Sequence, residues 1–188
     1  LNEMVGCTAE GAAEVFRVCT ELMETVQEMR QPVIAQVQGV ATAAGCQLVA
    51  ACDLAIAAEE AWFATPGVKI GLFCSTPMVA LTRAIGRKRA MEMLLTARAV
   101  PAREAAEWGL INRAVPGGEL AGAVRELAAA VANGAAYPVE LGKRTFYEQI
   151  EMPQREAYEL ARSVMERNAM AEVAQGEMRA FLENRGVR

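Results

Sequence analysis

Residues 32–72 read PVIAQVQGVATAAGCQLVAACDLAIAAEEAWFATPGVKIGL, and this stretch decides the fold. A short apolar strand is predicted at residues 33–37, and it leads into a turn of small residues that begins at Gly39. Residues 43–52 are apolar on nearly every helical face, which predicts a buried helix. Strands are predicted at residues 54–58 and 62–64, before a Pro-Gly turn. This order of elements predicts an α/β fold.

The turn of small residues is the first candidate site. Small side chains let a ligand approach the main chain closely, and the helix that starts there points free N–H groups into that space. Such donors suit the negative charge that develops on a carbonyl oxygen in thioester chemistry. A tight contact between helix and strand explains the same composition, because small-residue turns are common. Both interpretations remain open for Gly39, Ala41, Ala43, Ala44 and Gly45.

Three nearby residues each have a functional and a structural interpretation. Gln47 can orient a ligand or a water, or it can be a buried amide with its hydrogen bonds satisfied; it does not exchange a proton near neutral pH. Gly67 follows a strand end, where side chains commonly face a ligand, but it also suits a plain turn. Asp53 is either a catalytic acid or a brace for the turn into the next strand.

The segment Cys74-Ser75-Thr76 carries three small nucleophilic side chains at a predicted helix start. Ser75 or Thr76 is expected to cap this helix, with Pro77 in the first turn. A helix N-terminus favours a thiolate, so Cys74 as a nucleophile is the alternative. Four basic residues can meet phosphates or lie on a solvated face: Lys143, Arg144, Arg185 and Arg188.

The rest of the chain is predominantly helical. A helix over residues 8–30, with Thr8 as its cap, precedes the decisive stretch. We predict a core at residues 1–118 and a helical region at residues 119–188, with further strands preceding Leu1, because few strands would leave an exposed apolar edge. Helices are predicted at residues 75–85, 87–96, 101–108, 120–132, 138–150 and 155–182, the last interrupted near residues 168–172 or at Gly176, and a strand at residues 110–115.

Composition limits the classes of function. The chain has 188 residues, 53% hydrophobic and 22% charged, with a net charge of −4 and no basic block, so nucleic acid is not an expected partner. No apolar run is long enough for a membrane span. The chain has no histidine, which excludes Ser–His–Asp and Cys–His catalysis and histidine metal sites. Its five cysteines are irregularly spaced, which predicts reduced thiols and a cytoplasmic protein, or a mitochondrial one in a eukaryote.

The decisive stretch resembles the core pattern of the crotonase (enoyl-CoA hydratase/isomerase) family, PVIAAVNGxAxGGGxELAxxCDxxxAxxxAxFxxPExxxGL. Two later runs, RAIGRKRAMEMLLTARAVPAREAAEWGLINRAVP and EMRAFLENR, resemble further family motifs, so the resemblance covers essentially the whole chain. It implies a ββα-superhelix core with a helical C-terminal trimerisation region, assembled as a homotrimer or a dimer of trimers. It also implies an acyl-CoA ligand in fatty acid metabolism, with no further cofactor and no metal.

The resemblance assigns roles to particular residues. The N–H of Ala44 matches one of two donors that hold the thioester oxygen; the second belongs to an A-G-x-D-L segment, of which Leu1-Asn2-Glu3-Met4 resembles the tail. Gln47 and Gly67 stand where hydratases carry two catalytic glutamates, and Ser75 lies near the residue that helps to hold the water. Phe181 and Arg185 match residues that contact the CoA nucleotide, often from a neighbouring subunit.

Three functions follow. The first is an acyl-CoA-binding protein of this fold without ordinary hydratase activity. The second is an enzyme, a hydratase, isomerase, lyase or hydrolase, that uses a non-standard acid or base: water held by Gln47 and Ser75, or a carboxylate such as Asp53. The third is a scaffold or regulatory protein without catalysis. Loss of one general acid or base costs about 10²–10⁴-fold, so loss of both disfavours ordinary hydration.

Overall fold

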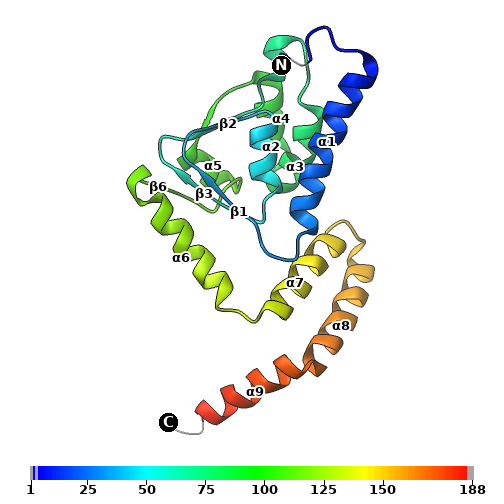
Figure 1. Ribbon diagram of the computed structural model, residues 1–188, viewed down its shortest axis with the longest axis vertical. Helices are drawn as coiled ribbons and strands as arrows, with labels where there is room; N and C mark the ends of the chain where they lie inside the picture. The colour runs from blue at the N-terminus through cyan, green and yellow to red at the C-terminus, as the bar shows by residue number, and fades with distance from the viewer. Residues whose placement is uncertain (1, 3, 186–188) are drawn as a thin grey trace. The chain divides into compact units, whose positions relative to one another are not determined.

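The computed structural model describes residue 2 and residues 4–185 of the chain. The chain folds into two compact units. The first holds the chain up to Met29 and from Val33 to Ala128, and the second holds Arg30–Pro32 and the chain from Ala129 onward. The strands and the candidate turn belong to the first unit (Figure 1).

Two three-stranded sheets lie within the described part of the first unit. In one, β1 (Ile34–Val37), β3 (Leu54–Ala58) and β6 (Arg113–Val115) run parallel in the order β1-β3-β6. In the other, β2 (Val40–Thr42) pairs in parallel with β4 (Trp62–Ala64), which pairs antiparallel with β5 (Val100–Pro101). The strand pairs β1-β2 and β3-β4 thus place one strand in each sheet before the chain enters a helix, which is the ββα arrangement that the family resemblance implies.

Helices α1 (Ala9–Glu28) to α4 (Arg87–Thr96) gather on one side of the strands (Figure 1), and buried apolar side chains from strands and helices form the core. Thr8 caps the first helix as predicted, because the Gly11 N–H donates to Thr8 Oγ1 at 3.1 Å. The most deeply buried large side chains include Phe63, Leu81, Met93 and Leu94. The helices of this unit are α1 (Ala9–Glu28), α2 (Ala44–Ala51), α3 (Ser75–Ala84), α4 (Arg87–Thr96), α5 (Ala102–Trp108) and the 3-10 turns η1 (Pro66–Ile70) and η2 (Gly117–Glu119).

The second unit is helical. After α6 (Leu120–Ala132), which begins in the first unit, come α7 (Ala136–Gln149), α8 (Gln154–Met170) and α9 (Glu172–Arg185). Helices α7 and α8 pack against each other, and α9 continues from α8 (Figure 1). The long predicted helix breaks at Ala171, within the expected interval, whereas Gly176 lies inside α9, so the alternative break there is wrong.

Two polar side chains complete the β1-β3-β6 sheet. Asp53 accepts a hydrogen bond from the Val33 N–H at 2.7 Å and joins the entries of β1 and β3, as the bracing interpretation predicts. Asn112 accepts from the Ala55 N–H at 2.7 Å through Oδ1, while its own N–H donates to the Ala55 carbonyl at 2.8 Å. Asn112 thus pairs with Ala55 through its side chain and its main chain, just before β6 begins. The strand itself covers only Arg113–Val115, so it is shorter than the predicted strand at residues 110–115.

Candidate functional site

The site is centred on the start of α2. Ala43 precedes the helix with φ 47° and ψ −116°, a conformation that an L residue other than glycine adopts at a cost of about 1–3 kcal/mol. The Ala43 N–H donates to the Ala64 carbonyl at 3.0 Å, and the Ala43 carbonyl accepts from the Gln47 N–H at 3.0 Å. These two bonds fix the strained residue between the end of β4 and the first turn of α2.

The first N–H groups of α2 are open to a ligand. Ala44 and Gly45 are exposed, and no side chain caps the helix. None of the described residues accepts a hydrogen bond from the Ala44 or Gly45 N–H. Unpaired N–H groups at the positive end of a helix dipole attract a negatively polarised oxygen. The helix start is therefore suited to bind a carbonyl oxygen on which negative charge develops.

Gln47 lies one turn into α2 and is buried, with 5% of its surface exposed. Its Oε1 accepts a hydrogen bond from the Cys19 thiol of α1 at 3.7 Å. The amide oxygen is thus engaged with the neighbouring helix, which is the geometry of the buried-amide interpretation. An amide in this position has no proton to exchange near neutral pH.

Gly67 lies in η1, after β4, and is buried. Its N–H donates to the Cys74 sulfur at 3.3 Å, and its carbonyl accepts from the Leu72 N–H at 3.0 Å. Gly71 ends η1 in the left-handed region with φ 76°, which lets the chain turn back on Gly67. The Pro-Gly turn is therefore closed by the residues that follow it.

Ser75 is exposed and is the first residue of α3, not its cap. The residue before the helix is Cys74, and neither Ser75 nor Thr76 caps it, so the predicted cap is wrong. The Cys74 sulfur accepts from the Gly67 N–H and makes no capping hydrogen bond to α3. Ser75 Oγ instead donates to the Phe73 carbonyl at 3.4 Å.

The residues expected to meet the CoA nucleotide belong to the second unit. Phe181 lies on α9 with 58% of its surface exposed, and Arg185 is the last residue of that helix. The side chain of Arg185, together with Leu1, Glu3 and Arg188, lies outside the described residues. Lys143, an alternative phosphate ligand, donates to the Gln31 carbonyl at 3.0 Å. Ala44, Gln47, Gly67 and Ser75 all belong to the first unit.

The buried cysteines of the first unit, Cys46 and Cys74, belong to its apolar core. Burial raises the pKa of the Cys46 thiol to about 12, and the neighbouring Cys74 contributes to the same upward shift. Cys46 therefore stays protonated at neutral pH and serves as a small apolar residue of α2. Among residue 2 and residues 4–185, no set of three or more Cys, Asp or Glu side chains is arranged to hold a metal.

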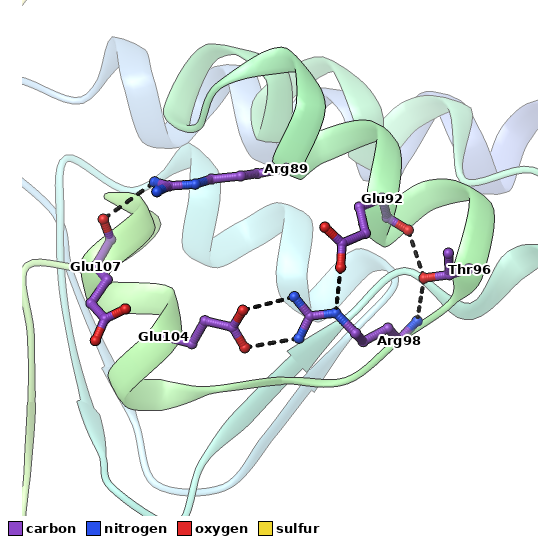
Figure 2. Close-up of polar contacts among 6 residues, drawn as sticks. All are labelled: Arg89, Glu92, Thr96, Arg98, Glu104 and Glu107. Carbon is purple, nitrogen blue, oxygen red and sulfur yellow. Dashed lines mark hydrogen bonds and ion pairs between the residues drawn. The ribbon is translucent and has the colours of Figure 1, made fainter.

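A second polar cluster joins α4 to α5 (Figure 2). Both terminal nitrogens of Arg98 donate to Glu104 at 2.8 Å, and its Nε donates to Glu92 at 2.8 Å. The Arg98 and Arg89 guanidinium groups lie 5.0 and 5.5 Å from the Trp108 ring centroid. This cluster was not predicted from the sequence. The Arg, Glu and Trp residues of two successive predicted helices could have indicated ion pairs and cation–π contacts between those helices. Because its charges are paired internally, we assign it a structural role.

The alternating ββα units and the open helix start define a protein of the crotonase fold. The family model for enoyl-CoA hydratase/isomerase matches residues 1–188, and the chain belongs to that family. The fold and the family predicted from the sequence motifs are thereby confirmed.

Several relatives are similar over most of the chain. Mouse enoyl-CoA hydratase domain-containing protein 3, mitochondrial, is 46% identical over 92% of this chain and 58% of its own length. The chain thus spans somewhat more than half of that relative. A crystal structure of enoyl-CoA hydratase from Mycobacterium smegmatis has 44% identity and a TM-score of 0.96, over 98% of this chain and 72% of that one. The crystal structure of human enoyl-CoA hydratase domain-containing protein 3 has 45% identity and a TM-score of 0.91, over 93% of this chain and 69% of that one.

The described helices also bear on a membrane location. Across residue 2 and residues 4–185, no helix combines the length and the apolar character that crossing a lipid bilayer demands.

Proposed function

We propose that this chain binds an acyl-CoA thioester, with the thioester carbonyl oxygen accepting a hydrogen bond from the Ala44 N–H. The observation that carries the proposal is the start of α2, where Ala44 and Gly45 are exposed and Ala43 is held at φ 47°. A strained conformation of this kind persists where the surroundings hold it and is frequent in ligand sites. The preorganised N–H group needs no rearrangement to meet the oxygen.

The same site lacks a proton relay for adding water. Hydration of an enoyl thioester needs one group to deprotonate the water and one to protonate the α-carbon. Gln47 offers an amide whose oxygen already accepts from Cys19, and Gly67 has no side chain. We therefore propose that the bound thioester is not hydrated at the rate of an ordinary enoyl-CoA hydratase.

We further propose that copies of the chain associate through the second unit, as a trimer or a dimer of trimers. Apolar side chains that stay exposed in one chain favour burial against another protein surface. Several such side chains on α8 and α9 are more than half exposed: Tyr158, Met165, Met170, Phe181 and Leu182. For a eukaryotic source, the mitochondrial names of the vertebrate relatives support a mitochondrial location.

Calorimetric titration and a hydration assay test the proposal. Calorimetry with butyryl-CoA and with free CoA measures how much the thioester adds to affinity, and we expect butyryl-CoA to bind more tightly. The rate of crotonyl-CoA hydration should stay near the uncatalysed rate. It is measured as the loss of the absorbance of the conjugated enoyl thioester. Equal affinity for the two ligands would refute thioester recognition, and rapid hydration would refute the missing proton relay.

A further inference from the structure

The turn at Gly67 is closed by a single short segment, residues 71–74. The Gly67 N–H donates to the Cys74 sulfur, and the Gly67 carbonyl accepts from the Leu72 N–H as well as from the Gly71 N–H that ends η1. Cys74 is buried, with 8% of its surface exposed, so this contact lies inside the protein. Gly67 and Cys74 are therefore held together across seven residues of sequence.

This closure leaves no space for a side chain at position 67. A β-carbon added to Gly67 would lie 2.9 Å from the Cys74 sulfur, 3.0 Å from the Leu72 carbonyl oxygen and 3.1 Å from the Cys74 nitrogen. Two of these three atoms are main-chain atoms, which cannot rotate away as a side-chain end can. Any side chain at this position requires residues 72–74 to move.

Thr65 lies two residues before Gly67 and carries a buried hydroxyl without a hydrogen-bond partner among the described residues. It precedes η1, where a threonine hydroxyl normally accepts from an N–H two or three residues later. Here the Gly67 N–H already donates to Cys74. Thr65 is only 1% exposed, and its Oγ1 has no hydrogen-bond partner among the described residues. A buried hydroxyl without a partner is normally unfavourable.

We infer that Gly67 and Cys74 form one sterically coupled pair, in which the Cys74 sulfur occupies the space that a side chain at position 67 would need. A carboxylate cannot be placed there by changing residue 67 alone. This inference deepens the proposed function and rests on it for the chemical meaning of position 67. The steric dependence between the two residues does not rest on acyl-CoA binding.

A double-mutant cycle tests the pair through thermal unfolding of Gly67→Ala, Cys74→Ala and the double variant. We expect Gly67→Ala to lower the melting temperature by about 3–10 °C, as overpacking does. The loss in the double variant should be smaller than the sum of the single losses, because removing the sulfur relieves the closest contact. Gly122→Ala is the matched control, since nothing lies within 4 Å of its added β-carbon. Additive losses, or an unchanged melting temperature for Gly67→Ala, would overturn the inference.

Two further variants examine the surroundings of the pair: Thr65→Val tests the unpaired hydroxyl, and Gly67→Glu tests whether a carboxylate fits at position 67. Thr65→Val should leave the melting temperature unchanged or raise it, because it replaces an unpaired hydroxyl with a methyl group of similar size. A drop of several degrees would show that the hydroxyl has a partner in the folded chain. Gly67→Glu should be destabilised and should gain no crotonyl-CoA hydration. A stable, hydrating Gly67→Glu would overturn the pair, whereas butyryl-CoA titration of the unmodified chain tests the proposed function separately.

Discussion

Replacing Ala44 with proline removes the proposed donor and also acts on Ala43, because a residue before proline favours extended backbone with ψ of about +120 to +160°, whereas Ala43 has ψ −116°. Ala44 is the first residue of α2, where the N–H has no partner within the helix and proline's fixed φ suits the helix. Its exposure leaves space for the proline ring. The substitution therefore removes one N–H group from the ligand while the first turn can persist.

The expected loss of affinity is modest and measurable. A hydrogen bond from an uncharged N–H to a neutral carbonyl contributes about 0.5–1.5 kcal/mol, which corresponds to about 2- to 13-fold weaker binding. Calorimetry with butyryl-CoA measures this change. The affinity for free CoA should stay the same, because the lost donor faces only the thioester oxygen.

A matched proline controls for effects on the fold. Ala136 is the first residue of α7, is also exposed and also follows an alanine, so Ala136→Pro controls for the loss of an N–H at a helix start. Ala135 is extended, with φ −61° and ψ 136°, so the added strain at Ala43 is controlled by the melting temperature of Ala44→Pro. Ala136→Pro should bind butyryl-CoA as the unmodified chain does. If Ala44→Pro keeps its melting temperature and binds with undiminished affinity, the Ala44 N–H does not hold the thioester.

Three other predictions concern stability and reactivity. Ala43→Gly should raise the melting temperature by about 2–4 °C, because glycine accepts φ 47° without the strain and the relief exceeds its entropic cost; a lower melting temperature would show that Ala43 is unstrained. Glu104→Gln should cost about 1–2 kcal/mol in the free energy of unfolding at pH 7, measured with urea. The hydrogen bond from Arg98 lowers the pKa of Glu104 in the folded chain. The loss of stability in Glu104→Gln should therefore be constant at pH values well above the unfolded pKa of about 4.3, and it should vanish as the pH falls through the lower folded pKa. A loss of stability that persists at pH 2 would contradict this prediction. In thiol labelling at pH 8, exposed Cys7 should react rapidly and Cys46, with a pKa of about 12, only on unfolding; rapid labelling of Cys46 in the folded chain would contradict its burial.

Periodicity and composition predicted the longer elements because those features are local. The strands at residues 54–58 and 62–64 and the helices at residues 87–96 and 120–132 have the predicted bounds. Strands β2 and β5 were missed, since each has at most three residues and owes its conformation to pairing with β4. Few strands were therefore expected where two three-stranded sheets are seen among the described residues.

The site was partly predictable for the same reason. Small residues around Ala44 left two interpretations open, an accessible helix start and a tight packing contact, and the structure shows that start exposed and without a side-chain cap. The contact between Gly67 and Cys74 depends on how a loop folds back, which neither residue type reveals. The start of α3 without a side-chain cap and the unpaired Thr65 hydroxyl lie close to this contact in the sequence, and residue types did not predict either of them.

A crystal structure of the chain with butyryl-CoA tests the central claim most directly. The account predicts that the thioester oxygen lies about 2.7–3.2 Å from the Ala44 nitrogen, with no carboxylate within hydrogen-bond distance of the α- and β-carbons. A thioester oxygen bound elsewhere, or a carboxylate positioned at those carbons, would contradict it.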